Sequence, residues 1–365
     1  MKLKLIELRK LEIPFRVSFK HTSAERTSTE AVIAVAQSES SMSGYGEGCP
    51  RSYVTGESIE SCMDFITTHH QSIVEIDDID SLRAFISTNQ SAIDKNPSAW
   101  CAIETAILDL LGKLEGKSIE AVLGIPEIQG SFHYSAVLGV LNPKVFAAQL
   151  AQYIQIGFHD FKVKISGDVT IDASNIAAIR TALPKAKIRL DANNLWNDAD
   201  EAIAYLDALA PHFWAVEEPI KACDYAGLKT LAERLGCKII IDESFLRIED
   251  FEQLSGDARV WIPNIRISKM GGLLRSLAIA EECRKHGIKF IIGAQVGETS
   301  ILTRAAICLA NAYRDNLIAQ EGAYGTHLLE HDITDLPIMF GENGVVNLGA
   351  NSIKGLGLNT KKIYF

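Results

Sequence analysis

The chain has 365 residues, of which 47% are hydrophobic and 22% charged, and its formal net charge is −10. This length suffices for one large domain with a smaller domain beside it. An acidic chain lacks the positive field that a nucleic acid backbone or an anionic membrane surface attracts, so neither is an expected partner. No uncharged apolar run approaches the length of a membrane-spanning helix, so we expect no membrane insertion.

The seven cysteines include no Cys-x-x-Cys pair, and their odd number argues against a disulfide framework or a thiolate zinc site. Charged residues interrupt the first ten positions, unlike the apolar core of a signal peptide. We therefore expect reduced cysteines and a cytoplasmic protein.

The first 125 residues predict an α+β domain. Short apolar runs at 3–13 and 31–36 predict an antiparallel meander, and the following Gly44-x-Gly-x-Gly48 segment is typical of a hairpin because no helix follows it. Helical spacing is found at about 57–72 and 79–88. It is clearest from Ser98 to Leu114, where the apolar residues fall on one face.

From about residue 130, short apolar runs alternate with helical segments, which is typical of repeated βα units. The runs that we interpret as strands lie at 134–138, 161–165, 187–191, 213–217, 238–242, 260–269, 289–293 and 317–320. Eight consecutive units favour a closed (β/α)₈ barrel, a modified TIM barrel, over residues 126–325. We expect residues 326–365 to pack back on the 1–125 domain.

One ionisable residue ends each of five successive predicted strands, and the steps between these residues are 27, 26, 25 and 27 positions. The five are Lys164, Asp191, Glu217, Asp242 and Lys269. A nearly constant step of one βα unit predicts equivalent positions at the carboxyl ends of strands two to six. In such barrels this rim carries the catalytic residues.

Strands two and six lie opposite each other in an eight-stranded barrel, so Lys164 and Lys269 are expected to face each other across the mouth. The three carboxylates between them form an oxygen-only set that suits Mg²⁺, with Mn²⁺ as the alternative, better than zinc. A cation next to a substrate carboxylate would favour loss of the neighbouring proton. A lysine must be neutral to accept that proton, and Lys162, on the same strand face as Lys164, supplies a like charge that favours neutrality.

The combination of motifs resembles the muconate lactonizing enzyme subgroup of the enolase superfamily. It consists of Lys162-x-Lys164, Asp191-Ala-Asn193, Glu217-Glu-Pro, Asp242-Glu-Ser and Lys269-Met-Gly-Gly. The resemblance implies a capped barrel in which Asp191, Glu217 and Asp242 bind the metal and the Lys164–Lys269 pair acts as acid and base. It also favours Glu217 over Glu218, because the family's ligand stands two residues before the proline.

The resemblance leaves the product open. Our leading prediction is an isomerase that racemises or epimerises an N-acyl amino acid or dipeptide through an enolate intermediate. The alternatives are a muconate-type cycloisomerase, an o-succinylbenzoate synthase and a non-catalytic barrel binding protein. We expect a small-molecule carboxylate substrate and a homo-oligomer.

Three further residues are candidates for contact with the substrate or support of the metal: Asn193, Gln295 and Glu321. Dipeptide epimerases resembling this chain carry Asp-x-Asp after strand eight, where this chain has only Glu321 as an acid. The His327-x-x-Glu-His331 segment matches a short zinc motif, but no helical pattern surrounds it, and a loop is a poor scaffold for zinc.

Overall fold

The computed structural model describes residues 2–21, 24–209, 212–254, 256–349 and 353–361, and all statements below concern these residues. Its N-terminal part (residues 2–125) contains a three-stranded antiparallel sheet in the order β1 (Leu3–Leu11), β4 (Ala31–Ser38) and β5 (Ser43–Gly48). The predicted meander is therefore confirmed. A hairpin of β2 (Pro14–His21) and β3 (Ala24–Ser28), which the sequence analysis did not predict, is inserted between its first two strands.

The helices of the N-terminal part are α1 (Ile59–Val74), α2 (Ile79–Thr88), α3 (Gln90–Lys95), α4 (Pro97–Glu115) and α5 (Ile119–Leu123). Side chains cap three of the starts, because Ser58, Asp78 and Ser118 each accept a hydrogen bond from the backbone N–H three residues on. The predicted helices at 57–72, 79–88 and 98–114 correspond to α1, α2 and α4.

Helix α4 is buried on all sides from Pro97 to Gly112, although the sequence pattern predicted burial of one face. It lies directly on β5, whose three glycines leave room for it. A Cβ atom at Gly46 would stand only 1.9 Å from the carbonyl oxygen of Ala102, and Gly44 and Gly48 are equally close to the helix backbone. The three glycines of this segment thus allow α4 to pack closely against strand β5.

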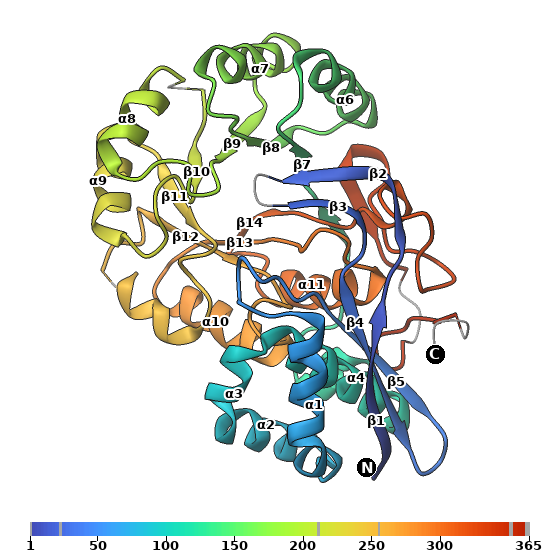
Figure 1. Cartoon of the computed structure of the whole chain (residues 1–365). Coiled ribbons are helices and arrows are strands. Elements are labelled where there is room, and N and C mark those ends of the chain that lie inside the picture. Colours follow the sequence, from blue (N-terminus) through green and yellow to red (C-terminus); the bar gives the residue numbers. More distant parts are fainter. Residues whose placement is uncertain (1, 22–23, 210–211, 255, 350–352, 362–365) are drawn as a thin grey trace.

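The second part of the chain forms a sheet of eight parallel strands, drawn in the middle of Figure 1 with helices around it. In sequence the strands are β7 (Ala136–Leu138), β8 (Asp160–Lys164), β9 (Lys187–Asp191), β10 (Ala215–Glu217), β11 (Lys238–Ile241), β12 (Trp261–Ile265), β13 (Phe290–Ile292) and β14 (Leu317–Gln320). Their spatial order is their sequence order. Ser135 N donates to the carbonyl oxygen of Gln320 at 2.7 Å, which brings the first and last strands together and completes the predicted barrel.

Helices α6 (Pro143–Ile156), α7 (Val169–Ala182), α8 (Ala199–Asp207), α9 (Tyr225–Leu235), α10 (Leu273–Lys285) and α11 (Ser300–Ala312) connect the strands. The fifth connection departs from the predicted βα repeat, because it contains only the 3₁₀ helix η1 (Ile248–Gln253). The Asp250 carboxylate accepts the N–H groups of Leu246 and Arg247 and closes a tight turn there.

Apolar side chains fill part of the barrel interior below the rim. Five of them, from strands β10 to β14, form a cluster separate from the main core: Ala215, Ile240, Ile262, Ile291 and Ala319. Alternate residues of a strand point to the same side, so Ala215 lies beneath Glu217 and Ile262 beneath Asn264. On the side formed by β10 to β14, the charged rim therefore rests on apolar side chains.

The C-terminal residues contact both parts of the molecule. Strand β15 (Val345–Asn347) pairs with β6 (Ser131–His133). Farther on, Leu356 N donates to the Asp109 carboxylate of α4, and Gly355 N to the carbonyl oxygen of Lys117. None of the described helices is both long and apolar enough to cross a lipid bilayer.

Candidate active site at the barrel mouth

Three of the predicted site residues form one row across neighbouring strands. Lys164 pairs with Asp191 in the register of β8 and β9, and Asp191 pairs with Glu217 in the register of β9 and β10. Asp242 directly follows β11, two residues beyond the partner of Glu217. The parallel register thus brings these four side chains to the same end of the barrel.

At one end of the row, Lys164 is held between two acceptors. Its Nζ lies 3.0 Å from Asp191 Oδ2 and donates to Asn193 Oδ1 at 2.6 Å. Asn193 N donates to the other Asp191 oxygen at 3.2 Å, and its φ of 46° lies in the left-handed region. Asn193 therefore positions both the lysine and the acid, at a backbone strain that is often stored at functional sites.

At the other end, Lys269 meets Asp242. Its Nζ lies 2.6 Å from Asp242 Oδ1 and 2.7 Å from the carbonyl oxygen of the same residue. The prediction that Lys269 ends a strand spanning 260–269 is wrong, because β12 stops at Ile265 and Lys269 lies in the following turn. The turn still directs the side chain to the acid row from the strand opposite β8.

Lys162 lies beneath the row and contacts three carboxylates. Its Nζ is 3.0 Å from Asp191, 2.8 Å from Glu217 and 3.3 Å from Glu321. Burial alone would lower the pKa of Lys162, but these acids outweigh burial and raise it. The acids therefore favour the charged form of Lys162, which makes Lys162 itself a poor proton acceptor.

The electrostatics of the acid row suit a cation. Burial raises the pKa of Glu217 to about 8, and the neighbouring carboxylates add to the rise although Lys162 opposes it. Glu217 Oε2 is buried and has no hydrogen bond of good geometry in the described structure. Further positive charge would therefore stabilise the ionised form of Glu217. Carboxylate oxygens are also the ligands that hard divalent cations prefer.

The acids do not yet converge on a single point. No group of three acidic, histidine or cysteine side chains within the described ranges is arranged to hold a metal ion. Lys162 lies between Asp191 and Glu217, and Arg266 lies between Glu217 and Asp242. The three predicted ligands are therefore adjacent but separated by cationic side chains, which would have to withdraw for a shared cation.

Two buried arginines at this end of the barrel were missed by the sequence analysis. Arg189 is fully buried and pairs with Glu321 at 2.9 Å and with Asp160 at 2.6 Å. Arg266 pairs with Asp242, donates to Gln295 Oε1 at 3.2 Å and lies 3.7 Å from Glu217. The period-two rule that identified Lys162 also applies to Arg189, which stands two residues before Asp191.

The remaining candidates occupy different places. Glu321 lies inside the barrel on Lys162 and Arg189, so its charge is already compensated. Gln295 is buried beside Arg266. His327 stacks on Phe340 and its ring nitrogen contacts the carbonyl oxygen of Phe340, within a short 3₁₀ turn that does not form the helix required by the zinc motif.

Glu217 and Glu218 have different surroundings. Glu217 Oε1 accepts from Asn264 Nδ2 at 3.1 Å within the barrel. Glu218 Oε1 accepts the N–H groups of Asp242 and Ser244 at 2.7 Å, and its other oxygen accepts the Ser244 hydroxyl at 2.9 Å. Glu218 therefore closes the turn after β11, while Glu217 belongs to the acid row.

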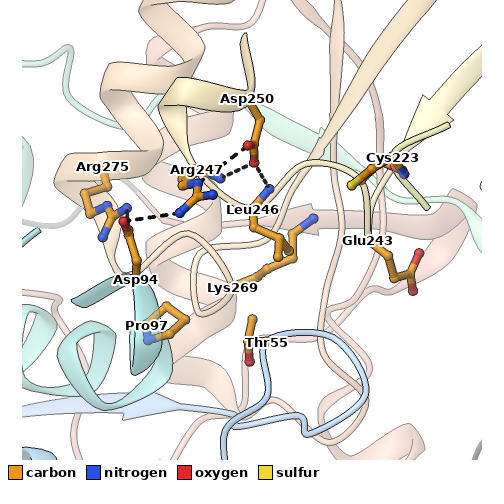
Figure 2. Close-up of a pocket in the computed structure, with 11 residues that line it drawn as sticks. Thr55, Asp94, Pro97, Cys223, Glu243, Leu246, Arg247, Asp250, Lys269 and Arg275 are labelled. Atoms are coloured by element: carbon orange, nitrogen blue, oxygen red, sulfur yellow. Dashed lines mark hydrogen bonds and ion pairs between the residues drawn. The ribbon is translucent and has the colours of Figure 1, made fainter. Parts of the chain in front are cut away.

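A cavity of about 190 Å³ opens beside Lys269. Figure 2 shows Lys269 between Thr55 of the N-terminal part and Leu246 of the barrel, with Arg247, Arg275 and Asp94 along one wall. The N-terminal part thus contributes to the surroundings of a predicted catalytic lysine.

Comparison with known proteins identifies the family. Residues 145–362 match the family model described as "Enolase C-terminal domain-like". The chain belongs to this family. The predicted enolase superfamily membership and capped barrel are thereby confirmed.

Three relatives show where the chain stands within the family. A hydrophobic dipeptide epimerase of Enterococcus faecalis is 30% identical over 86% of this chain and 88% of its own length. An N-succinyl-L-Arg/Lys racemase of Bacillus cereus is 26% identical over 85% of this chain and 84% of its own length. A crystal structure of the Enterococcus faecalis V583 dipeptide epimerase, complexed with Mg and the dipeptide L-Leu-L-Tyr, has a TM-score of 0.85 and 28% identity, covering 98% of this chain and all of that one. These names agree with the predicted isomerase.

Proposed function

We propose that this chain is a Mg²⁺-dependent epimerase or racemase that exchanges the α-proton of a dipeptide or N-acyl amino acid. The observation that carries the proposal is the position of two lysines at opposite ends of one acid row. Lys164 pairs with Asp191 at 3.0 Å and Lys269 with Asp242 at 2.6 Å, and their strands are four apart in the eight-strand order. The dipeptide epimerase and N-succinyl amino acid racemase relatives support the substrate class.

Asp191, Glu217 and Asp242 would hold the cation, and Mn²⁺ is the alternative occupant. A bound divalent cation would supply positive charge to the substrate carboxylate as its α-proton leaves. One lysine removes the proton from one face of the α-carbon and the other returns a proton to the opposite face. Lys162 would stay charged below the acids after it withdraws from between Asp191 and Glu217, and Asn193 would orient Lys164.

The test uses the purified chain in deuterium oxide with Mg²⁺. Hydrophobic dipeptides such as L-Leu-L-Tyr and N-succinyl-L-arginine are incubated with the enzyme, and NMR follows loss of the α-proton signal and appearance of the second stereoisomer. We expect exchange that depends on Mg²⁺ and stops with a chelator. A product with new bond connectivity would favour the cycloisomerase alternative, and absence of both exchange and Mg²⁺ binding would favour a non-catalytic barrel.

A further inference from the structure

Arg266 is a cation that no step of the proposed reaction uses. It directly follows β12, and its side chain is only 13% exposed. One terminal nitrogen, Nη2, pairs with Asp242 Oδ2 and lies 3.7 Å from Glu217 Oε1. The other, Nη1, donates to Gln295 Oε1 at 3.2 Å. The guanidinium therefore connects two proposed metal ligands, Glu217 and Asp242, with Gln295 in the loop after the seventh barrel strand.

A guanidinium in this position excludes a shared metal ion. Arginine does not lose its proton in proteins, so Arg266 cannot relieve the conflict by becoming neutral. Mg²⁺ requires direct oxygen ligands at about 2.0–2.1 Å in near-octahedral geometry. The Asp242 oxygen that now accepts from Arg266 would have to turn to the metal, and the two cations would repel each other.

Arg266 also has a partner outside the acid row. Gln295 already accepts one of its N–H groups and is buried beside it. The Nε of Arg266 is buried and has no hydrogen-bond partner among the described residues, so its present position leaves a donor unused. The contact with Gln295 is made through Nη1, whereas the contact with Asp242 is made through Nη2.

We propose that Arg266 is a positioning residue that stands in for the metal between Glu217 and Asp242, and that it moves toward Gln295 when a divalent cation binds. The proposal rests on the metal site of the proposed function. Arg266 keeps the acids compensated in the metal-free protein and sets the cation concentration at which the site fills. Removing it therefore strengthens metal binding, which a residue that only supports the fold would not do.

The experiment measures Mg²⁺ affinity by titration calorimetry for the wild type, Arg266→Met and Arg247→Met. Arg247 is the matched control, because it carries a guanidinium in the neighbouring cavity but pairs with Asp94 and Asp250 rather than with a proposed ligand. We expect Arg266→Met to bind Mg²⁺ at least about 10-fold more tightly, since one charge-assisted hydrogen bond no longer has to be broken. Arg247→Met should bind like the wild type.

Thermal unfolding gives a second readout. Without metal, Arg266→Met should melt below the wild type because Glu217 and Asp242 lose their counter-charge, and the rise in Tm on adding Mg²⁺ should be larger than for the wild type. If Arg266→Met does not fold, Arg266→Lys replaces it. A lysine keeps the positive charge but lacks the forked geometry of the guanidinium. The Mg²⁺ affinity of Arg266→Lys should therefore rise by a smaller factor than expected for Arg266→Met.

Two results overturn the proposal in distinguishable ways. If the wild type binds Mg²⁺ and the folded Arg266 variants bind it equally or more weakly, Arg266 is an ordinary ion-pair partner and the proposed function stands. If the folded wild type does not bind Mg²⁺ or Mn²⁺ at all, both the role of Arg266 and the proposed function fail.

Discussion

Lys164 Nζ lies 3.0 Å from Asp191 Oδ2, and the two residues are direct partners in the parallel register of β8 and β9. The proposed base and the proposed metal ligand are thus fixed to each other by the sheet rather than by a mobile loop. Lys269 also contacts an acid of the row, Asp242, but it does so from the turn that follows β12. The proposed function assigns each lysine its own face of a substrate held over the acids.

The first prediction separates the two lysines. Lys269→Ala should abolish α-proton exchange from one enantiomer and leave exchange from the other measurable, and Lys164→Ala should do the reverse. Loss of a general base typically lowers the rate by about 10² to 10⁴. Stereospecific exchange in deuterium oxide, followed by NMR, measures both rates.

Lys238→Ala is the control for these variants, because Lys238 begins β11 at the far end from Asp242 and contacts the carbonyl oxygen of Arg259. It should leave both rates unchanged. Loss of exchange from both enantiomers, or from neither, in the single lysine variants would contradict the assignment of two bases.

The second prediction distinguishes two adjacent glutamates. Loss of a residue that only hydrogen-bonds a metal ligand typically weakens metal binding by about 10- to 100-fold. Glu217 is itself a proposed ligand, so Glu217→Gln should weaken Mg²⁺ binding by more than this. Glu218→Gln should retain most of the affinity but lower the free energy of unfolding by about 1–3 kcal/mol, because it disturbs the hydrogen bonds that close the turn at Asp242 and Ser244. Calorimetry measures the Mg²⁺ affinity, and urea unfolding measures the stability. If Glu218→Gln lost Mg²⁺ affinity and Glu217→Gln kept it, Glu218 would be the ligand instead of Glu217.

The third prediction concerns the buried charge under the rim. Arg189→Met should lower the free energy of unfolding by about 3–5 kcal/mol, since Glu321 and Asp160 lose their buried partner. Arg259→Met is the control. Arg259 is 91% exposed and pairs with Asp257, so its removal should change stability by less than about 0.5 kcal/mol.

A double variant, Arg189→Met with Glu321→Leu, should regain part of the lost stability, because it also removes the buried carboxylate that has lost its arginine and keeps only the Lys162 contact. A single Arg189→Met variant as stable as the wild type would show that the pairing with Glu321 does not hold the barrel together.

The fourth prediction concerns pH. The Glu104 carboxyl of α4 accepts the N–H of Leu274 at the start of α10, and burial raises its pKa from 4.5 to about 7. The folded chain therefore keeps this proton to a higher pH than the unfolded chain. The contribution of Glu104 to stability is greatest below about pH 4.5, falls between about pH 4.5 and 7, and is constant above that range.

Glu104→Gln cannot ionise and should remove this part of the pH dependence. The free energies of unfolding of wild type and variant are measured from pH 4 to 8. As the pH rises, the wild type should lose stability relative to the variant, by on the order of 3 kcal/mol for the pKa shift of Glu104. Glu47 and Glu57, whose pKa values burial also raises to about 7, stay unchanged in both proteins and cancel in the difference. A difference that does not vary with pH would contradict the buried, protonated state of Glu104.

Much of the site could be predicted because its spacing follows the βα repeat. Lys164, Asp191, Glu217 and Asp242 stand near equivalent strand ends, and the parallel register brings them together. The end of β12 was less predictable, since the apolar pattern continues through Ile267 into the turn that carries Lys269. The roles of the individual residues stay predictions that the variants above test.

The sequence by itself determined the eight-strand barrel, the superfamily and the carboxylate row, because periodic apolar runs and repeated spacing are local features of a chain. Only the tertiary structure decided which charges meet. Arg266 between Glu217 and Asp242, Arg189 on Glu321 and Glu104 at the start of α10 each join residues far apart in the chain. Such pairs depend on strand register and helix packing in three dimensions, and spacing along the sequence does not encode them.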